Sequence, residues 1–295
     1  MSPSEKPGKR APRRDSFASL NALVATSEIA LVATTEQDEL NASEQYPQSL
    51  AGAGRLHAME PQVATTLDVE RVLADRSLRI AFQPVCALRS REIIGYEALA
   101  RFPGEVITTP RQWFHQALQL GLLQALELLA ASTALEELAS LEEQAFLAIN
   151  VSPATAASKA FGELVSTVPP ERLVLEITEN ATMENYRRFT GAIDHLRSVG
   201  VRIALDDAGA ADVSLQHLLG VRPDIVKIDT TVIHGIAEDE VRQAVAYAYA
   251  NMAKRAGAVS LAEGIETEKE LAMLVSLEVE TGQGYLLGRP AFRGD

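Results

Sequence analysis

Short apolar runs alternate with longer amphipathic stretches along most of this chain. The runs lie at residues 79–85, 93–99, 146–150, 173–177, 201–206, 225–228, 259–262 and 284–287. Near-continuous apolar runs of this length are typical of strands that are buried on both faces. Stretches with helical periodicity lie between most of them, at residues 110–141 with a break near Gly121, and at 153–166, 184–199, 238–255 and 267–277. Eight strands with interleaved helices predict an α/β fold, a (β/α)8 TIM-type barrel.

The connection between the first two apolar runs departs from a regular barrel. Only residues 88–92 separate the two runs, which is too short for a crossover between parallel strands. We therefore expect the first strand to be antiparallel to the second. Helix ends also carry signals: Ser152-Pro153 predicts a capped start, Gly200 predicts a stop, and Thr267 with Glu270 predicts a capping box.

Residues 1–65 differ from the rest of the chain. They are rich in Ser, Ala, Thr, Glu and Gln, with scattered Pro and Gly. Such a segment buries too little apolar surface to offset its ordering entropy. We predict a disordered tail or linker over residues 1–65 and one barrel domain over residues 66–295.

Charge and composition exclude several classes of protein. The net charge is −13, and the basic start of the chain makes the remainder more acidic still, which argues against binding of DNA or RNA polymers. The one cysteine, Cys86, rules out an intrachain disulfide and a cysteine zinc site. No apolar stretch approaches the ~18 residues of a membrane span, and no signal-peptide core is present. We therefore expect a cytoplasmic protein without a membrane span.

Polar residues gather at the ends of the predicted strands. They are Glu97, Asn150, Glu176, Asp206, Asp207, Lys227, Glu263 and Gln283. In a barrel of this type, function sits at the carboxyl ends of the strands. Five carboxylates at one mouth would repel one another in a cleft of low dielectric constant, and bound cations would offset that repulsion. Oxygen ligands without His or Cys favour Mg²⁺ or Mn²⁺.

The adjacent pair Asp206-Asp207 suggests more than one ion. At the end of a strand, two neighbouring carboxylates can both turn inward and bridge or separate two metals. Such a two-metal site suits phosphodiester cleavage. Lys227 would add a fixed positive charge, and Glu263 would take a proton from water or ligate the second metal.

The order of these motifs resembles the EAL domain family. Glu-Ala-Leu at residues 97–99 looks like the signature that names it. A further matching segment precedes the triplet at residues 83–85. Others follow it in order at residues 150–153, 175–179, 206–207, 227–229, 262–267 and 283–290. The resemblance covers about residues 66–292, and the ordered set is far more specific than the triplet alone.

The resemblance implies hydrolysis of cyclic di-GMP to linear pGpG with two Mg²⁺ or Mn²⁺ ions. By that resemblance Glu97, Asn150, Glu176 and Asp206 hold one metal, and Asp206, Asp207 and Glu263 serve the second metal and the attacking water. Lys227 orients that water and Glu179 braces the loop after the fifth strand. Gln83, Arg101 and Gln283 contact the substrate, with Arg101 as a phosphate clamp. A homodimer through the barrel is also implied.

One loop departs from the family pattern and keeps alternatives open. The family commonly has Asp-Asp-Phe-Gly-Thr-Gly-Tyr-Ser-Ser-Leu, and residues 206–215 are Asp-Asp-Ala-Gly-Ala-Ala-Asp-Val-Ser-Leu. A degenerate domain that senses cyclic di-GMP or binds a protein partner is the first alternative. A different metal-dependent barrel enzyme, such as a lyase with Lys227 as base, is the second. The five histidines show no metal-ligand spacing, and we expect them at the surface or in packing.

Overall fold

The computed structural model describes residues 66–103, 109–177, 183–208 and 222–293 of the 295-residue chain. The side chains of residues 66–67, 183–190 and 206–208 are outside this description. The predicted tail over residues 1–65 also lies outside the described residues.

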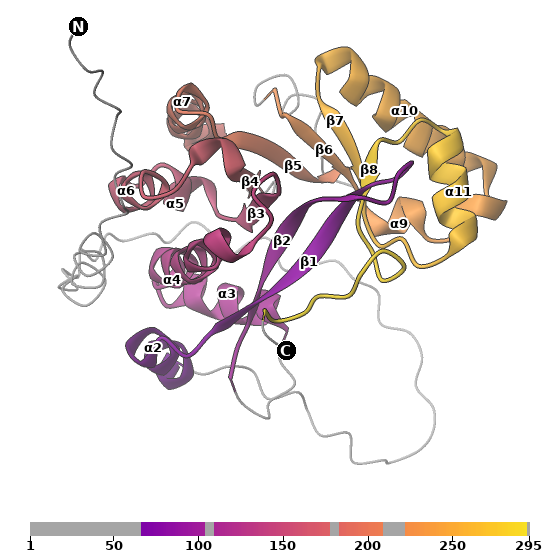
Figure 1. Cartoon of the computed structure of the whole chain (residues 1–295). Helices are drawn as coiled ribbons and strands as arrows, with labels where there is room; N and C mark the ends of the chain where they lie inside the picture. The colour runs from indigo at the N-terminus through magenta and orange to yellow at the C-terminus, as the bar shows by residue number, and fades with distance from the viewer. Residues whose placement is uncertain (1–65, 104–108, 178–182, 209–221, 294–295) are drawn as a thin grey trace, which may run out of the picture. The chain divides into compact units, whose positions relative to one another are not determined.

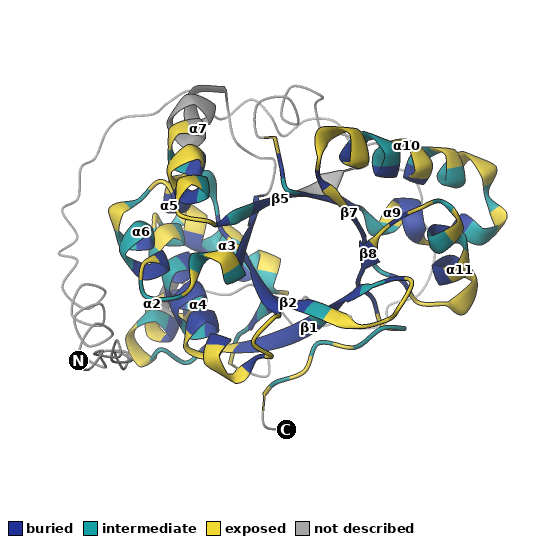
Figure 2. Cartoon of the chain, turned by 45° about the horizontal axis from the view of Figure 1, so that its top comes forward, coloured by how far each residue is buried: buried dark blue, intermediate teal, exposed yellow. Residues whose placement is uncertain are grey.

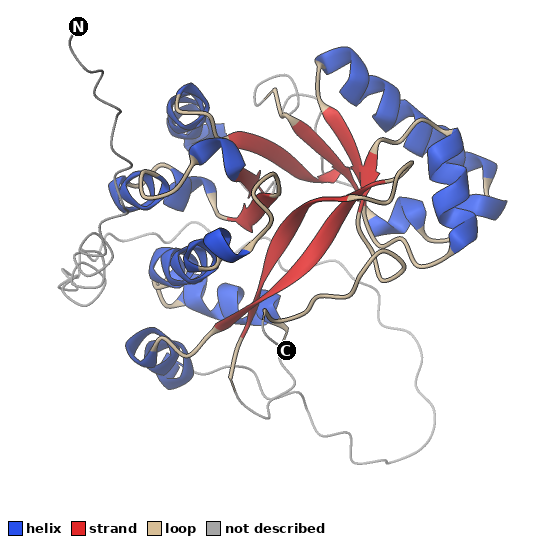
Figure 3. Ribbon diagram, viewed as in Figure 1, coloured by secondary structure: helices blue, strands red, loops and turns tan. Residues whose placement is uncertain are grey.

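Eight strands close into a barrel in which each strand pairs with its neighbours in the sequence (Figures 1 and 3). They are β1 (Arg79–Ala87), β2 (Ile93–Arg101), β3 (Phe146–Asn150), β4 (Leu173–Ile177), β5 (Arg202–Ala208), β6 (Ile225–Ile228), β7 (Val259–Ala262) and β8 (Thr281–Gly282). Strand β1 is antiparallel to both β2 and β8, and the other neighbouring pairs are parallel. The predicted barrel with an antiparallel first strand is confirmed.

The eighth strand is shorter and earlier than predicted. We expected it at residues 284–287, but β8 covers Thr281–Gly282 and a turn follows, in which the amides of Leu287 and Gly288 donate to Gly284 O. A Cβ at Gly284 would lie 2.1 Å from Ile265 N, so the chain passes here at backbone contact distance. Leu286 and Leu287 are apolar because they pack against the cluster under α10 and α11.

Helices lie on the outside of the barrel, on either side of the β1–β2 pair (Figure 2). They are α2 (Thr66–Asp75), α3 (Pro110–Gln119), α4 (Leu123–Glu136), α5 (Pro153–Ala156), α6 (Lys159–Val165), α7 (Met183–Ser198), α9 (Thr230–Ile233), α10 (Glu240–Ala256) and α11 (Glu268–Ser276). The predicted helix at 153–166 is divided in two, because Ser158 caps α6 by accepting from Phe161 N. None of the helices in the described ranges is long and apolar enough to cross a bilayer.

Two apolar layers hold the barrel together. Its interior is filled by Val85, Phe146, Ala148, Val174, Ala204, Ile225 and Leu261. Gly95 leaves room there for the ring of Phe146, which a Cβ would approach to 2.5 Å. A second cluster, including Ile228, Ile265 and Leu271, lies between the barrel and helices α10 and α11. The interior is therefore a packed core, and polar groups are left to the strand ends.

Candidate metal-dependent active site

Six of the polar residues found at strand ends in the sequence gather at one end of the barrel. Glu97 lies on β2, Asn150 ends β3, Glu176 lies on β4 and Lys227 on β6. Asn150 and Glu176 stand side by side in the β3–β4 register. Backbone pairing continues past the strands, because Glu263 N donates to Ile228 O and Gln283 N donates to Ala262 O. The mouth of the barrel is thus built on regular, well-fixed backbone.

The Lys227 ammonium lies among three carboxylates. Its Nζ is 2.8 Å from Glu176 Oε2, 2.9 Å from Glu263 Oε1 and 3.9 Å from Glu97 Oε1. Lys227 is only 1% exposed, and Glu176 only 2%. A buried charge of this kind is tolerated only when it is paired, so these side chains depend on one another.

Two amides fix the orientation of Glu97. Asn150 Nδ2 donates to Glu97 Oε1 at 3.1 Å, and Gln283 Nε2 donates to Glu97 Oε2 at 2.7 Å. The same Gln283 nitrogen donates to Glu263 Oε1 at 3.1 Å. Both oxygens of Glu97 therefore have a donor, and Gln283 links Glu97 to Glu263.

Glu97 stays ionised despite its burial. Burial by itself would raise the pKa of this carboxyl, but the charge of Lys227 and the hydrogen bonds from Gln283 and Asn150 outweigh it and hold the pKa below its ordinary value. An ionised carboxylate in a buried mouth is the form that binds a cation.

The donor atoms of the cluster suit a hard divalent cation. Three carboxylates and one ammonium sum to a formal charge of −2. The buried Gln283 Oε1 has no hydrogen-bond partner among the described residues, which leaves an oxygen acceptor in the site. No three described acidic, histidine or cysteine side chains are arranged to share one ion.

Three of the predicted site residues are described only in their backbone or not at all. Asp206 and Asp207 lie in β5, where the pairing with β6 shifts register between Leu205 and Ala208. Such irregularities re-aim side chains next to active sites, but the side chains of this pair are outside the described residues. Glu179 is outside them altogether.

The two remaining predicted substrate residues differ in their placement. Gln83 pairs with Glu97 across β1 and β2, and its Nε2 donates to Gly288 O at 3.3 Å. Arg101, at the end of β2, is half-buried and donates from Nη1 to Ala100 O. Gln83 therefore belongs to the mouth, and no described contact joins Arg101 to the acidic cluster.

A cavity of about 250 Å³ opens beside Glu263 and Gln283. Its lining also includes Thr230, His234, Glu266 and Tyr285, which the sequence did not single out. His234 was expected at the surface or in packing, and it is indeed exposed. Its position directly after the short helix α9 was the available signal, because loops that follow barrel strands line the mouth.

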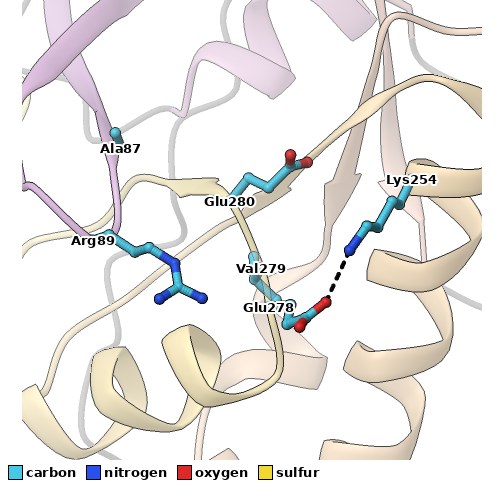
Figure 4. Close-up of a pocket in the computed structure, with 6 residues that line it drawn as sticks. All are labelled: Ala87, Arg89, Lys254, Glu278, Val279 and Glu280. Carbon is cyan, nitrogen blue, oxygen red and sulfur yellow. Dashed lines mark hydrogen bonds and ion pairs between the residues drawn. The ribbon is translucent and has the colours of Figure 1, made fainter.

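A larger cavity of about 420 Å³ lies where the end of β1 meets the residues that lead into β8 (Figure 4). It is lined by Ala87, Arg89, Lys254 and residues 278–280. Lys254 Nζ lies 3.0 Å from Glu278 Oε2, so opposite charges on its wall pair with each other. It lacks the buried, converging carboxylates of the mouth, which makes the mouth the candidate site.

Comparison with known proteins identifies the family. The family model for the EAL domain matches residues 67–290. The chain belongs to the EAL domain family. A relative, the cyclic di-GMP phosphodiesterase NbdA of Pseudomonas aeruginosa, is 28% identical over 235 residues, which cover 76% of this chain and 30% of NbdA.

Solved EAL structures share the fold. The PaMucR phosphodiesterase of Pseudomonas aeruginosa, in its c-di-GMP complex, matches with a TM-score of 0.69 at 27% identity and covers 77% of this chain and 97% of that chain. Klebsiella pneumoniae BlrP1, as a manganese/cy-diGMP complex, matches with a TM-score of 0.67 at 25% identity and covers 80% of this chain and 59% of that one. The EAL domain spans about a third of the length of most of the curated relatives it matches.

Proposed function

We propose that this EAL domain hydrolyses cyclic di-GMP to linear pGpG with the help of two Mg²⁺ or Mn²⁺ ions. The observation that carries the proposal is the buried cluster in which Glu97, Glu176 and Glu263 surround Lys227 and are linked by Asn150 and Gln283. Relatives named as cyclic di-GMP phosphodiesterases and the c-di-GMP complex of PaMucR support this choice of substrate.

The proposed metal ligands follow the oxygen donors of the mouth. Glu97, Asn150, Glu176 and Asp206 would hold one ion, and Asp206, Asp207 and Glu263 the second. Bound there, the ions would lower the pKa of water and neutralise charge on the phosphate. The manganese complex of BlrP1 supports a divalent ion in this family.

The side chains of the chain itself would position the reactants. Glu263 would accept the proton of the attacking water, and Lys227 would hold that water. The water oxygen forms a bond to phosphorus while the P–O3′ bond breaks, and the leaving oxygen becomes a 3′-hydroxyl by taking up a proton. Gln83 and Gln283 would contact the substrate from the mouth, and Arg101 would hold a phosphate oxygen.

Turnover with purified protein tests the proposal. We expect that cyclic di-GMP incubated with the protein and Mg²⁺ or Mn²⁺ is converted to pGpG, followed by chromatography, and that a chelator stops the reaction. Conversion that continues unchanged with the chelator present would contradict the role of metals.

Glu97 provides the sharpest variant. Glu97→Ala should abolish turnover because it removes an oxygen ligand, takes away the acceptor of the Asn150 amide and leaves the Gln283 amide with Glu263 alone. Glu97→Gln keeps the size of the side chain and should also be inactive. Glu92→Ala is the matched control, since Glu92 is exposed in the β1–β2 turn. Activity retained by both Glu97 variants would show that the metal assignment is wrong.

One sequence feature supports a second function. The loop at 208–213 departs from the family pattern, so a domain that binds cyclic di-GMP without cleaving it is the alternative. Binding measured by calorimetry without any pGpG would favour this sensor. Absence of both binding and turnover would favour a role in binding a protein partner.

A further inference from the structure

Glu270 makes more contacts than a helix cap requires. In the predicted capping box, Glu270 Oε2 accepts from Thr267 N at 2.9 Å and Glu270 N donates to Thr267 Oγ1 at 3.2 Å. The same Oε2 accepts from Glu266 N at 3.0 Å. The other oxygen, Oε1, accepts from Gly235 N at 3.2 Å. Gly235 is 35 residues away in the sequence, so this buried carboxylate joins two separate loops.

These two loops form one wall of the cavity beside the acidic cluster. The loop after β6 supplies Thr230 and His234, and the loop after β7 supplies Glu263, Gly264 and Glu266. Glu270 lies behind the wall, on the first turn of α11.

The loops also meet directly in front of Glu270. Gly264 has φ +69°, and a Cβ there would lie 2.7 Å from both Thr230 Oγ1 and Thr230 Cγ2. A side chain at position 264 would therefore collide with Thr230, so only glycine lets the two segments approach this closely. The loop that carries Glu263 thus lies directly against the segment that carries Thr230.

We propose that Glu270 is a positioning residue that locks these two loops into a single wall and so sets the affinity for the part of the substrate that fills the cavity. The inference rests on the proposed function for its substrate, cyclic di-GMP. Glu270 touches neither the cavity nor the acidic cluster, and it acts through the backbone of Gly235 and Glu266.

The carboxylate is needed for its two acceptor oxygens. A glutamine at this position keeps one acceptor and turns an N–H₂ toward the amides on the other side, where donor would face donor. One of the two loops then loses its anchor. Glu270→Gln therefore uncouples the loops while it preserves the size of the side chain.

The control is Glu268→Gln. Glu268 lies in the same first turn of α11 and loses the same charge, but its carboxylate accepts at the surface from Arg91, with Nη1 at 3.0 Å. Helix-terminal charge therefore changes equally in the two variants, and only Glu270→Gln disturbs the wall.

Steady-state kinetics of the full chain provides the first readout. We expect Glu270→Gln to raise KM for cyclic di-GMP about tenfold, because the wall of the cavity loosens and substrate binding weakens. The kcat should stay within about twofold of wild type, because the side chain of Glu263 keeps its contacts with Lys227 and Gln283. Glu268→Gln should change neither. If the wild type binds without turnover, the Kd for cyclic di-GMP replaces KM.

Hydrogen exchange provides a readout that does not need activity. Amides of the loop that loses its acceptor, either Gly235 or Glu266 with Thr267, should exchange faster in Glu270→Gln than in Glu268→Gln, while amides of β3 are unchanged. A wild type that neither binds nor cleaves cyclic di-GMP would contradict the proposed function. Hydrogen exchange would then still test whether Glu270 couples the two loops. Unchanged exchange in both loops would overturn the inference. A lower Tm with unchanged KM would also overturn it, since Glu270 would then be merely structural.

Discussion

At the scale of single residues, Lys227 supplies the positive charge that the three carboxylates of the mouth share. It is buried and lies within 3 Å of Glu176 and Glu263. Removing one partner of a buried ion pair leaves an uncompensated charge and costs about 3–5 kcal/mol. We expect Lys227→Met to lower the free energy of unfolding by about that amount and to abolish turnover, measured by urea denaturation and by pGpG formation.

Lys254→Met is the control for that prediction. Lys254 also pairs with a glutamate, Glu278, but its side chain is 68% exposed. Exposed pairs contribute little, so this variant should unfold almost as the wild type does. Equal urea midpoints for the two variants would show that the buried ion pairs of Lys227 do not contribute to stability as predicted.

Site residues at the strand ends could be found from the sequence, because the carboxyl ends of the barrel strands meet at one end of the barrel. Glu97, Asn150, Glu176, Lys227, Glu263 and Gln283 were found in this way, and the structure brings them together. Their catalytic roles stay predictions. The contact of Glu270 with Gly235 could not be found, because it depends on how two loops pack in space.

Helix α4 is joined to the start of α5 through Glu127. This glutamate stands in a helix that is otherwise largely apolar, and that was an unused signal for a buried partner. Its Oε1 accepts from Ser152 N at 3.0 Å and its Oε2 from Ser152 Oγ at 2.7 Å. Ser152 caps α5 and follows Asn150, a proposed metal ligand, by two residues. The contact with Glu127 therefore holds the short segment between Asn150 and α5 in place.

The pH dependence of stability tests this join between elements. Burial raises the pKa of Glu127 above its ordinary value, although hydrogen bonds from Thr155 and Ser152 oppose the shift. A raised pKa in the folded state gives stability that is complete below the unfolded pKa and is lost as the pH rises through the folded pKa. The wild type should therefore lose stability relative to Glu127→Gln from about pH 4 upward.

Urea unfolding at several pH values measures that difference. Glu136→Gln, on the same helix but paired with Arg76 at the surface, is the control. A difference between wild type and Glu127→Gln that does not change between about pH 4 and pH 8 would contradict the assignment.

Hydrophobic periodicity predicted the helices and strands of the barrel well, and its clearest error was the eighth strand. Most of the predicted strands and helices occur within a few residues of their expected bounds. The run at 284–287 was wrong as a strand because apolar side chains there pack under helices in a turn. A short apolar run indicates burial, and burial alone does not distinguish a strand from a turn.

The whole barrel should function without the segment that precedes it. Residues Val63–Asp295 form one compact unit, and this unit contains every residue of the proposed site. A protein that begins at Val63 should keep the Tm and the kcat of the full chain, measured by thermal unfolding and by pGpG formation. A large loss of turnover with an unchanged Tm would assign a regulatory role to residues 1–62.

The reversed direction of β1 also decides where the polypeptide joins the barrel. Arg79 pairs with Arg101 at the carboxyl end of β2, so the chain enters at the mouth. In a barrel with all strands parallel it would enter at the base, farther away by a strand length of about 30 Å for nine residues. Strand β1 thus begins at the end of the barrel that holds the acidic cluster.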